Sequence, residues 1–549
     1  MCSNGAEIDW VTVWDLFWVD CALDRSLRDP SRSTFGFLDS MTIFKSEFPP
    51  LPTPDRPFSY ALLDSLWKHR ERTALIDAHT KRSVTFQDLF LQSFSVATYL
   101  ENHNFRHGDV VCTVLHNCLE NFPIFLGTAL QGGALNELQY QFKDCGAKIV
   151  FCNEVSLDKV LKAVKQCPSV QSIIVVPGDL KNPKTYQFGV NSMTEVLSCQ
   201  PDFYRRKVDV DIHRDILTMP YSSGTTGAPK GVMISHSNLT AEVNILEYHV
   251  QDQIMRRIDP NYKSEEDTDL VYLPIYHMYG FCLFMKNMLY GVTTVIMSKF
   301  DLELMCRMVQ EYKVRCLKVV PPVLVALSKH PAIDKFDLSS IQAVISAAAP
   351  AGKELCEAVI KRFPHIKFIG QGYGLTETTA ASHFSVYQEN PKIGSAGKVC
   401  AGLEMKILDL KTRKPVGYNE TGEVCVKGNV VMMGYLNRHQ ATAESIDDEG
   451  WLRTDDVGYV DEDGDLFIVD RLKELIKVKG LQVAPAELED LLLTHPCIQD
   501  AAVIGVSDEA WGEIPMAFVV KKKAELKEED VIDFVKGEPV LKTFKNGQF

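Results

Sequence analysis

The stretch of the sequence best suited to chemistry is the run at residues 221–231, Tyr-Ser-Ser-Gly-Thr-Thr-Gly-Ala-Pro-Lys-Gly. Glycines let backbone N–H groups approach a ligand closely, while hydroxyls and a lysine add donors for phosphate oxygens. An ordinary polar turn is the alternative, since Gly, Ser, Thr and Pro mark turns generally. The density of such residues favours a loop that binds ATP, with these candidate contacts: Ser222, Ser223, Gly224, Thr225, Thr226, Gly227 and Lys230.

This run does not have the spacing of a Walker A loop. That motif needs a Gly-Lys pair followed by Ser or Thr, whereas Pro229 precedes Lys230 and Gly231 follows it. We therefore expect ATP binding outside the P-loop NTPase class.

Length, charge and cysteine usage limit the class of protein. The 549 residues exceed one ordinary core, so two or more domains are expected. A net charge of -14 argues against a nucleic-acid surface, so the expected partners are small molecules. The apolar stretch 10–23 contains two aspartates and is too short to span a bilayer, so no transmembrane segment is expected. The sequence contains no feature from which the oligomeric state can be predicted.

The fifteen cysteines are scattered without metal-binding spacing, and no cleavable signal precedes them. Reduced thiols in the cytoplasm are therefore expected, and no metal site is expected from the cysteines. The last residues, Asn546-Gly-Gln-Phe549, do not form a Ser-Lys-Leu-type peroxisomal address.

Strand and helix patterns alternate through most of the chain. Thr85 and Asp88 resemble a capping box that opens a helix to about Leu100. We therefore predict an α/β fold with a large domain of layered parallel β-sheets and helices at residues 41–469, after an extension at 1–40. Buried strands are expected at 109–115, 149–152, 173–176, 292–297, 317–320 and 343–346.

After about residue 450 the pattern changes to short alternating strands in a charged context. These predict a small α+β domain at residues 470–549, with a boundary and hinge at Asp470, where a charged segment leads into new strands. The strands are expected at 466–469, 475–478, 501–506 and 516–520.

Three motifs follow one another in the order seen in adenylate-forming enzymes: the loop at 221–231, Gln371-Gly-Tyr-Gly-Leu-Thr-Glu377, and the charged segment 470–487. From about residue 41 to about 535 the chain resembles the branch with 4-coumarate–CoA ligase, firefly luciferase and acyl-CoA synthetases. The resemblance implies that a carboxylate attacks the α-phosphorus of ATP, giving acyl-AMP, and that the thiol of coenzyme A then displaces AMP. It implies ATP, Mg²⁺ and coenzyme A as cofactors.

The resemblance assigns nucleotide contacts to the second motif. Glu377 matches the magnesium carboxylate, and Thr376 matches the residue that hydrogen-bonds the α-phosphate. Tyr373 matches the aromatic residue that stacks on adenine, with Gln371 and Gly372 beside it. Ordinary core packing is the alternative for the tyrosine.

Two segments are implied to surround the acid. In Ser346-Ala-Ala-Ala-Pro350, Ala347 and Ala348 line the acyl pocket and Ala349 lies at the adenine. The family usually has glycine at the position of Ala347, so the added methyl is expected to narrow the pocket. His277 and Tyr279 match residues that face the acid, and the histidine would orient the carboxylate; a buried structural histidine is the alternative.

The resemblance also assigns the ribose contacts. Asp456 matches the acid that binds both ribose hydroxyls, and Arg471 matches the second contact. Asp455 replaces the usual glycine, so the local turn must differ or be strained, and it adds a negative charge.

In this family the small domain swings between the two half-reactions, and Asp470 matches the hinge. A solvated amphipathic hairpin is the alternative for the charged segment that follows. The resemblance has Lys473, Lys477 and Gln482 contact the adenylate, with Lys477 catalytic, and has Lys479 and Gly480 line the coenzyme A tunnel.

The sequence departs from the family pattern in two places. The match ends before the terminal Pro-x-x-x-Gly-Lys motif, which predicts adenylation slowed by about 10²–10³-fold and an intact thioester step. At 132–137 about ten residues, including a strand, are missing relative to the family, so two helices are expected nearly to touch and the parallel sheet to lose a strand. These departures suggest a splice form or an imperfect gene model.

The leading interpretation is an acyl-CoA synthetase for a hydrophobic fatty or aromatic carboxylic acid. The alternative is a catalytically impaired isoform or paralogue that binds nucleotide or acyl ligand. The motifs alone also leave luciferase-type oxygenation open.

Overall fold

The computed structural model describes residues 42–53, 55–136, 142–178, 180, 186, 189–204, 207–222, 229–388, 392–478, 481–483, 485–508, 512–522 and 526–537. The expectations for the extension at 1–40 and for the end of the chain beyond 537 fall outside these residues. Internal contacts divide the chain into a larger unit, residues 44–405 with 426–452, and a smaller unit that includes 406–425 and 453 onward.

One sheet of the larger unit contains a run of six parallel strands. Its buried strands are rich in Val, Ile and Cys, as expected where both faces of a parallel sheet are covered. The strand order is β9 (Ile216–Met219), β5 (Ala134–Asn136), β4 (Val110–Val114), β6 (Ile149–Asn153), β7 (Ser172–Val176) and β8 (Val190–Ser192). The predicted strands at 109–115, 149–152 and 173–176 are confirmed.

Strand β5 corrects the expectation of a missing strand. Leu135 pairs with Val111 of β4 on one side and with Thr218 of β9 on the other. The Thr218 hydroxyl also donates to the Leu135 carbonyl at 3.2 Å. The three-residue strand β5, which follows helix α3 (Asn121–Leu130), is therefore long enough to fill the position between β4 and β9 in the sheet. The prediction failed because it equated a shorter loop with a lost strand.

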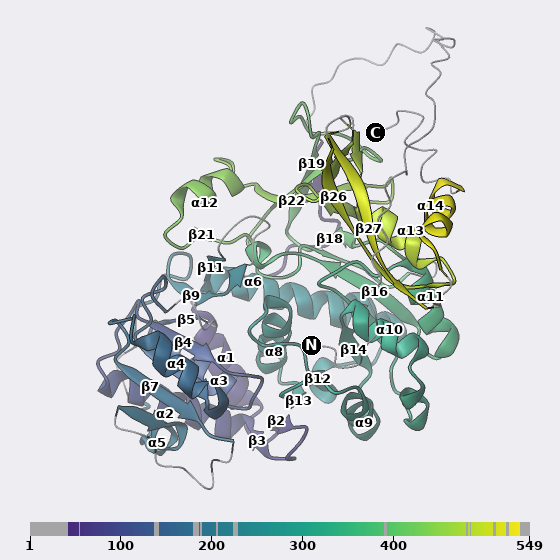
Figure 1. Cartoon of the computed structure of the whole chain (residues 1–549). Coiled ribbons are helices and arrows are strands. Elements are labelled where there is room, and N and C mark those ends of the chain that lie inside the picture. Colours follow the sequence, from purple (N-terminus) through teal and green to yellow (C-terminus); the bar gives the residue numbers. More distant parts are fainter. Residues whose placement is uncertain are drawn as a thin grey trace. The chain divides into compact units, whose positions relative to one another are not determined.

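Helix α2 (Phe86–Asn102) confirms the predicted capping box. The Thr85 hydroxyl accepts from the Asp88 amide at 3.0 Å, and the Asp88 carboxylate accepts from the Thr85 amide at 2.8 Å. The two bonds satisfy backbone donors that a helix start leaves open. Helices α1 (Phe58–Lys68), α2 and α3 pack against one another beside the β4 sheet (Figure 1).

Further parallel strands of the larger unit carry the remaining motifs. Strands β12 (Thr268–Val271), β13 (Thr293–Ile296) and β2 (Thr73–Asp77) form one parallel set. Strands β14 (Cys316–Val319), β15 (Ala343–Ser346) and β16 (Phe368–Tyr373) form another. The predicted strands at 292–297, 317–320 and 343–346 are confirmed, and each precedes a helix: α9 (Leu302–Tyr312), α10 (Pro321–Lys329) and α11 (Lys353–Arg362).

The smaller unit is α+β. Its sheet has the order β25 (Leu481–Val483), β24 (Ile476–Val478), β27 (Gly512–Lys521) and β26 (Ile498–Asp508), and helices α13 (Pro485–Leu493) and α14 (Glu528–Gly537) contribute to its core. The last two strands are longer than the predicted 501–506 and 516–520, because they pair as one continuous antiparallel ribbon. A second ribbon is formed by β22 (Leu452–Val460) and β23 (Asp465–Arg471).

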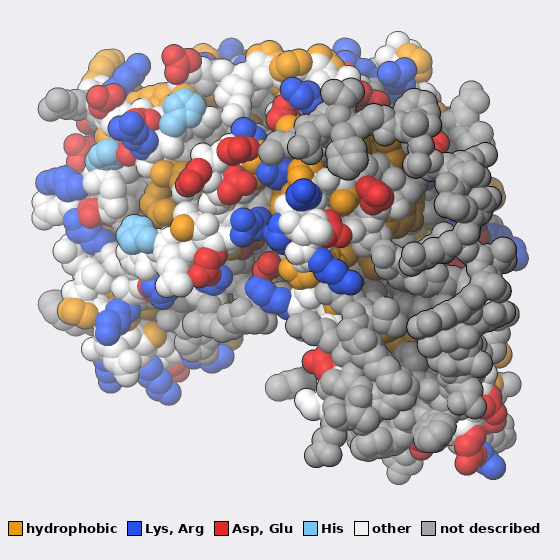
Figure 2. All heavy atoms as spheres, turned by 90° about the horizontal axis from the view of Figure 1, so that it is seen from above, with side chains coloured by type: hydrophobic (Ala, Val, Ile, Leu, Met, Phe, Trp, Pro, Cys, Tyr) orange, Lys and Arg blue, Asp and Glu red, His pale blue; other side chains and the backbone are white. Residues whose placement is uncertain are grey.

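In the described part of the chain, no helix combines the length and apolarity that a bilayer crossing requires. Over the described part of the face in Figure 2, acidic and basic side chains are interspersed.

Candidate active site

The predicted phosphate loop joins two paired strands. Strand β10 (Tyr221–Ser222) is antiparallel to β11 (Lys230–Ser235), with Ser222 opposite Lys230. The loop candidates Ser223, Gly224, Thr225, Thr226 and Gly227 lie outside the described residues. The strand before the loop is anchored, because the Tyr221 hydroxyl donates to the Asp144 carboxylate at 3.0 Å. The two ends of the loop are thus held side by side, as a phosphate-binding hairpin needs.

Tyr435 links the loop to the predicted magnesium carboxylate. The Lys230 ammonium lies 4.7 Å from the centre of the Tyr435 ring, a cation–π distance. The hydroxyl of the same ring donates to Glu377 Oε1 at 2.9 Å. Strand β21 (Gly434–Tyr435) reaches this place by pairing with β11. The structure therefore brings together Lys230 and Glu377, which lie far apart in the sequence.

The turn that carries Thr376 and Glu377 is a single 3₁₀ turn after β16. Gly374 is required before it, because a Cβ at that position would lie 1.7 Å from the Ala380 carbonyl oxygen. The Glu377 carbonyl accepts from the Met432 amide at 2.9 Å. Thr376 and Glu377 are half-buried, so their side chains are positioned by a fixed backbone and still partly accessible.

Buried polar groups also hold the backbone that follows the turn of Thr376 and Glu377. Thr379 adopts a positive φ of 64° and donates through its hydroxyl to the Val430 carbonyl at 2.6 Å. The Ala381 amide donates to Glu242, a fully buried carboxyl on helix α6 (His236–Glu247), at 2.8 Å. Burial raises the pKa of Glu242 to about 8.

The wall predicted to face adenine is organised by Gln371. Its side-chain oxygen accepts from the Ala351 amide at 2.8 Å, and its nitrogen donates to the Ala351 carbonyl at 3.2 Å. Gln371 therefore positions the end of the 346–351 segment. Within that segment, Ala348 has a positive φ of 75°, while Ala347 donates to the Val319 carbonyl at 3.2 Å. Ala348 and Ala349 are exposed.

Gly372 and Tyr373 end strand β16 and pair with β17 (His383–Phe384). The Tyr373 ring is half-buried and lies 5.6 Å from the His383 ring. The Tyr373 carbonyl accepts from the Ser382 amide at 2.8 Å. The backbone on both sides of Tyr373 is thus fixed, which orients its ring.

His277 is the N-cap of helix α8 (Met278–Leu289). Its Nδ1 accepts from the Tyr279 amide at 3.2 Å, so in the neutral ring the proton is on Nε2. Desolvation lowers the pKa of His277, although the side chain retains access to solvent. The Tyr279 hydroxyl donates to the Ile345 carbonyl at 3.2 Å, which ties this helix to β15.

Asn117 positions the segment before His277. Its amide donates to the Leu273 carbonyl and accepts from the Ile275 amide, both at 2.9 Å. Sequence reasoning missed both Asn117 and Tyr435. A single asparagine after a strand and a single tyrosine in an apolar stretch carry no local signal of such contacts.

In the smaller unit, Asp456 of β22 lies opposite Arg471 of β23. The Asp456 carboxylate is buried, and its Oδ1 lies 3.8 Å from Arg471 Nε. Asp455 has a positive φ of 60°, a left-handed conformation that glycine adopts freely and aspartate adopts less often, so the turn keeps a glycine-like conformation. Its charge is balanced by Lys473, whose ammonium lies 2.6 Å from Asp455 Oδ2.

Three of the remaining small-domain candidates lie on strands β23, β24 and β25. Asp470 lies within β23, buried, and accepts from the Arg471 amide at 2.7 Å. Lys477 and Gln482 pair across the β24–β25 hairpin. Lys479 and Gly480 lie outside the described residues. The hinge, adenylate and coenzyme A roles of these residues stay predictions.

The donor set around Glu377 fits magnesium. Among the described residues, no three His, Cys, Asp or Glu side chains come together in a way that could hold a metal. Magnesium commonly takes one or two carboxylates and completes its shell with water and substrate phosphate oxygens. A single half-buried carboxylate beside the phosphate hairpin has that character.

Comparison with protein families gives two matches. Residues 64–436 match the family of AMP-binding enzymes, and residues 487–546 match the AMP-binding enzyme C-terminal domain. Among similar proteins, 4-coumarate–CoA ligase 2 of Petroselinum crispum is 38% identical over 519 residues, which cover 91% of each chain. 4-coumarate–CoA ligase 1 of Narcissus pseudonarcissus is 36% identical over 518 residues, again 91% of each chain.

Solved structures agree with this match. The o-succinylbenzoate CoA synthetase of Bacillus subtilis, in complex with its acyl-adenylate intermediate, has 26% identity and a TM-score of 0.72, covering 88% of this chain and 92% of that chain. ATP-bound MatB from Rhodopseudomonas palustris, with 24% identity, a TM-score of 0.77 and the same coverage, shows the same fold.

Proposed function

Because the chain belongs to the AMP-binding enzyme family and is an AMP-forming acid–thiol ligase, we propose that it activates a hydrophobic carboxylic acid, fatty or aromatic, and transfers the acyl group to coenzyme A. ATP is the nucleotide of this chemistry, and Mg²⁺ and coenzyme A belong to the proposal. The names of the relatives, 4-coumarate–CoA ligases, support an acid with an apolar body.

One observation carries the proposal: Lys230 and Glu377 contact the same tyrosine. Attack of a carboxylate anion on a polyphosphate brings like charges together, so positive charge must be concentrated at the phosphates. Lys230 supplies one such charge directly. Glu377 would hold Mg²⁺, which supplies further charge neutralisation when bound. Thr376, beside Glu377 on the same fixed turn, offers a hydroxyl donor to a phosphate oxygen.

The acid is oriented by a neutral histidine in this proposal. Desolvation lowers the pKa of His277, which favours the neutral ring at neutral pH before the acid binds. Its Nε2–H is the available donor, because Nδ1 already accepts from the Tyr279 amide. A neutral donor orients a carboxylate oxygen without stabilising the anion so strongly that it ceases to be a nucleophile.

The body of the acid is proposed to lie near small and apolar groups. Tyr279 directs its hydroxyl to the Ile345 carbonyl, which leaves its ring as an apolar surface. Ala347 and Ala348 add only methyl groups. Such walls favour an apolar acid over a dicarboxylate, which would need a second cation.

The test is ATP–pyrophosphate exchange across a panel of fatty and aromatic acids, followed by thioester formation with coenzyme A. Exchange that requires an apolar acid, followed by thioester, supports the proposal. Nucleotide binding without exchange for any acid would contradict it and favour a binding role. Exchange driven best by a dicarboxylate would contradict the proposed acid class alone.

A further inference from the structure

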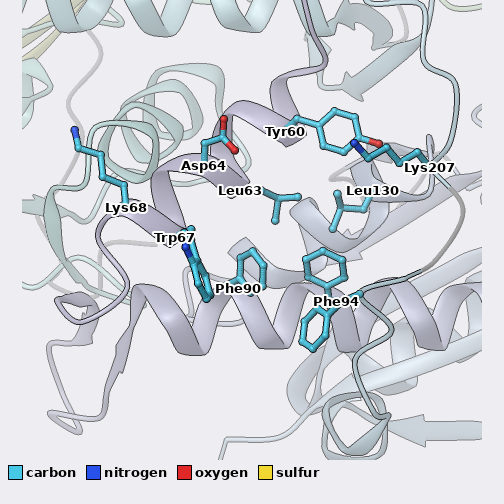
Figure 3. A pocket seen from close by; sticks show the side chains of 10 residues that line it. Tyr60, Leu63, Asp64, Trp67, Lys68, Phe90, Phe94, Leu130 and Lys207 are labelled. Atoms are coloured by element: carbon cyan, nitrogen blue, oxygen red, sulfur yellow. The ribbon is translucent and has the colours of Figure 1, made fainter.

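A cavity of about 550 Å³ lies between helices α1 and α2, apart from these site residues (Figure 3). It lies in the larger unit and contains none of the residues assigned above to ATP or the acid. It is lined by Tyr60, Leu63, Asp64, Trp67, Lys68, Phe90, Phe94, Leu130, Phe203 and Lys207. Its size falls in the range of about 300–1,000 Å³ that is usual for small-molecule sites.

One end of the cavity is aromatic. The rings of Phe90 and Phe203 are stacked with centroids 6.0 Å apart, and Phe94 meets Phe203 edge-on at 5.1 Å. Trp67 continues the row at 5.5 Å from Phe90. Trp67 and Phe203 nevertheless remain 54% and 49% exposed. Four neighbouring rings, two of them half in water, form a surface that an apolar ligand would cover favourably.

The other end is polar and carries positive charge. The Lys207 ammonium lies 5.4 Å from the centre of the Tyr60 ring, and Figure 3 shows both on the side of the cavity opposite Trp67 and Phe90. The one acidic side chain in the lining, Asp64, pairs with Arg56 at 2.5 Å. Among the described residues, no carboxylate pairs with Lys207. A net positive charge therefore faces the ligand space at this end.

From this polarity we infer a second ligand site that binds an organic anion with an extended apolar body, such as an aromatic carboxylate. The rings of Trp67, Phe90, Phe94 and Phe203 would take the body, and Lys207 would pair with the carboxylate. A cation over an aromatic face remains available to an anion, because the ring occupies only one side of the ammonium. The site lies apart from the residues of the ligase reaction and does not depend on the proposed function.

The test is isothermal titration with 2-naphthoate and, as its charge-reversed analogue, 2-naphthylmethylammonium. Phe203→Ala removes one ring of the row, and Lys207→Gln removes only the charge. We expect each substitution to weaken one naphthoate site by about tenfold or more, and Lys207→Gln not to weaken binding of the cation. Both residues lie outside the ligase site, so the loss they cause belongs to this cavity.

Matched controls are Phe300→Ala, another half-exposed ring of the larger unit, and Lys361→Gln on α11. Both should bind naphthoate like the unaltered protein. Unchanged binding in both cavity variants, or equal affinity of the unaltered protein for the anion and the cation, would overturn the inference. Thermal unfolding confirms that each variant is folded. ATP–pyrophosphate exchange, measured on the same cavity variants, tests the proposed ligase function separately. The cavity inference and the proposed function can therefore fail independently.

Discussion

The hydroxyl of Tyr435 donates to the Glu377 carboxylate at 2.9 Å. The ring of the same residue faces the Lys230 ammonium at 4.7 Å. One side chain therefore orients the proposed metal ligand through its polar tip and the phosphate lysine through its face. Tyr435 is a positioning residue, and its two contacts can be removed one at a time.

Tyr435→Phe keeps the ring and removes the hydroxyl. A hydrogen bond to a charged group is worth about 1.5–3 kcal/mol, so we expect kcat/KM for ATP–pyrophosphate exchange to fall by about tenfold or more. Because the missing hydroxyl no longer orients Glu377, the Mg²⁺ concentration that gives half of the maximal rate should increase. Tyr435→Leu, which also removes the face under Lys230, should cost more. The exposed Tyr418→Phe is the control, and a variant Tyr435→Phe with unchanged Mg²⁺ dependence would contradict the positioning role.

The buried carboxyl of Glu242 should make stability fall as the pH rises. Its folded-state pKa is raised to about 8, so the folded protein holds a proton that the unfolded chain, with an ordinary pKa, has already released. Stability from this group is therefore full at low pH and is lost progressively up to about pH 8. We expect the melting temperature to fall between about pH 7 and about pH 8, with no further fall from this group above its folded-state pKa, and Glu242→Gln to flatten that slope.

Buried histidines do not confound this test. Burial lowers the pKa of His236 to about 4 and those of His249 and His383 to about 3. Their contribution to stability is lost only as the pH falls below the ordinary histidine value, outside the window used for Glu242. An equal slope in Glu242→Gln and the unaltered protein would show that another group titrates.

His277 has a structural and a proposed substrate role, which two substitutions separate. Asparagine is a good N-cap, so His277→Asn should keep helix α8, whereas His277→Ala should lose about 1 kcal/mol of stability. Both variants lack the imidazole Nε2–H. We expect both to lower kcat/KM for the acid with little change in KM for ATP. A normal kcat/KM for the acid in His277→Asn would leave the histidine only its capping role.

The positive φ of Ala348 predicts opposite effects of glycine at two neighbouring alanines. At Ala348 glycine relieves the left-handed strain, which offsets its greater freedom in the unfolded chain. At Ala347, where φ is not positive, only the entropic cost remains. We expect Ala348→Gly to be more stable than Ala347→Gly by on the order of 1 kcal/mol in urea denaturation. The reverse order would contradict the assigned conformation.

Elements with a local code could be predicted from the sequence. The α2 start depends on Thr85 and Asp88, three residues apart, and the strands near 150 and 174 are continuous apolar runs. The prediction that the sheet loses a strand was wrong, because the pairing of β5 depends on Thr218 and Val111, far away in the chain. The long β26–β27 ribbon was underestimated for the same reason, since each strand extends the other.

In the candidate site, too, features set by local sequence could be predicted, and contacts between distant residues could not. Motif order indicated Lys230 and Glu377, and the substitution at Asp455 indicated an altered or strained turn there. The sequence could not indicate Tyr435 between the first two, nor that Lys473 lies on Asp455. These contacts depend on how separate strands bring side chains together, which residue types and spacing do not specify.

Strand β5 also has a mechanical consequence. It is the only described strand between β4 and β9, so the hydrogen bonds of three residues couple the β4–β8 side of the sheet to the β9–β11 hairpin that leads into the phosphate loop. A ladder this short opens more readily than its longer neighbours. Under load or thermal fluctuation the sheet would part at β5 first, so amide hydrogens of Leu135 and Asn136 are expected to exchange with solvent earlier than those of β6 or β7.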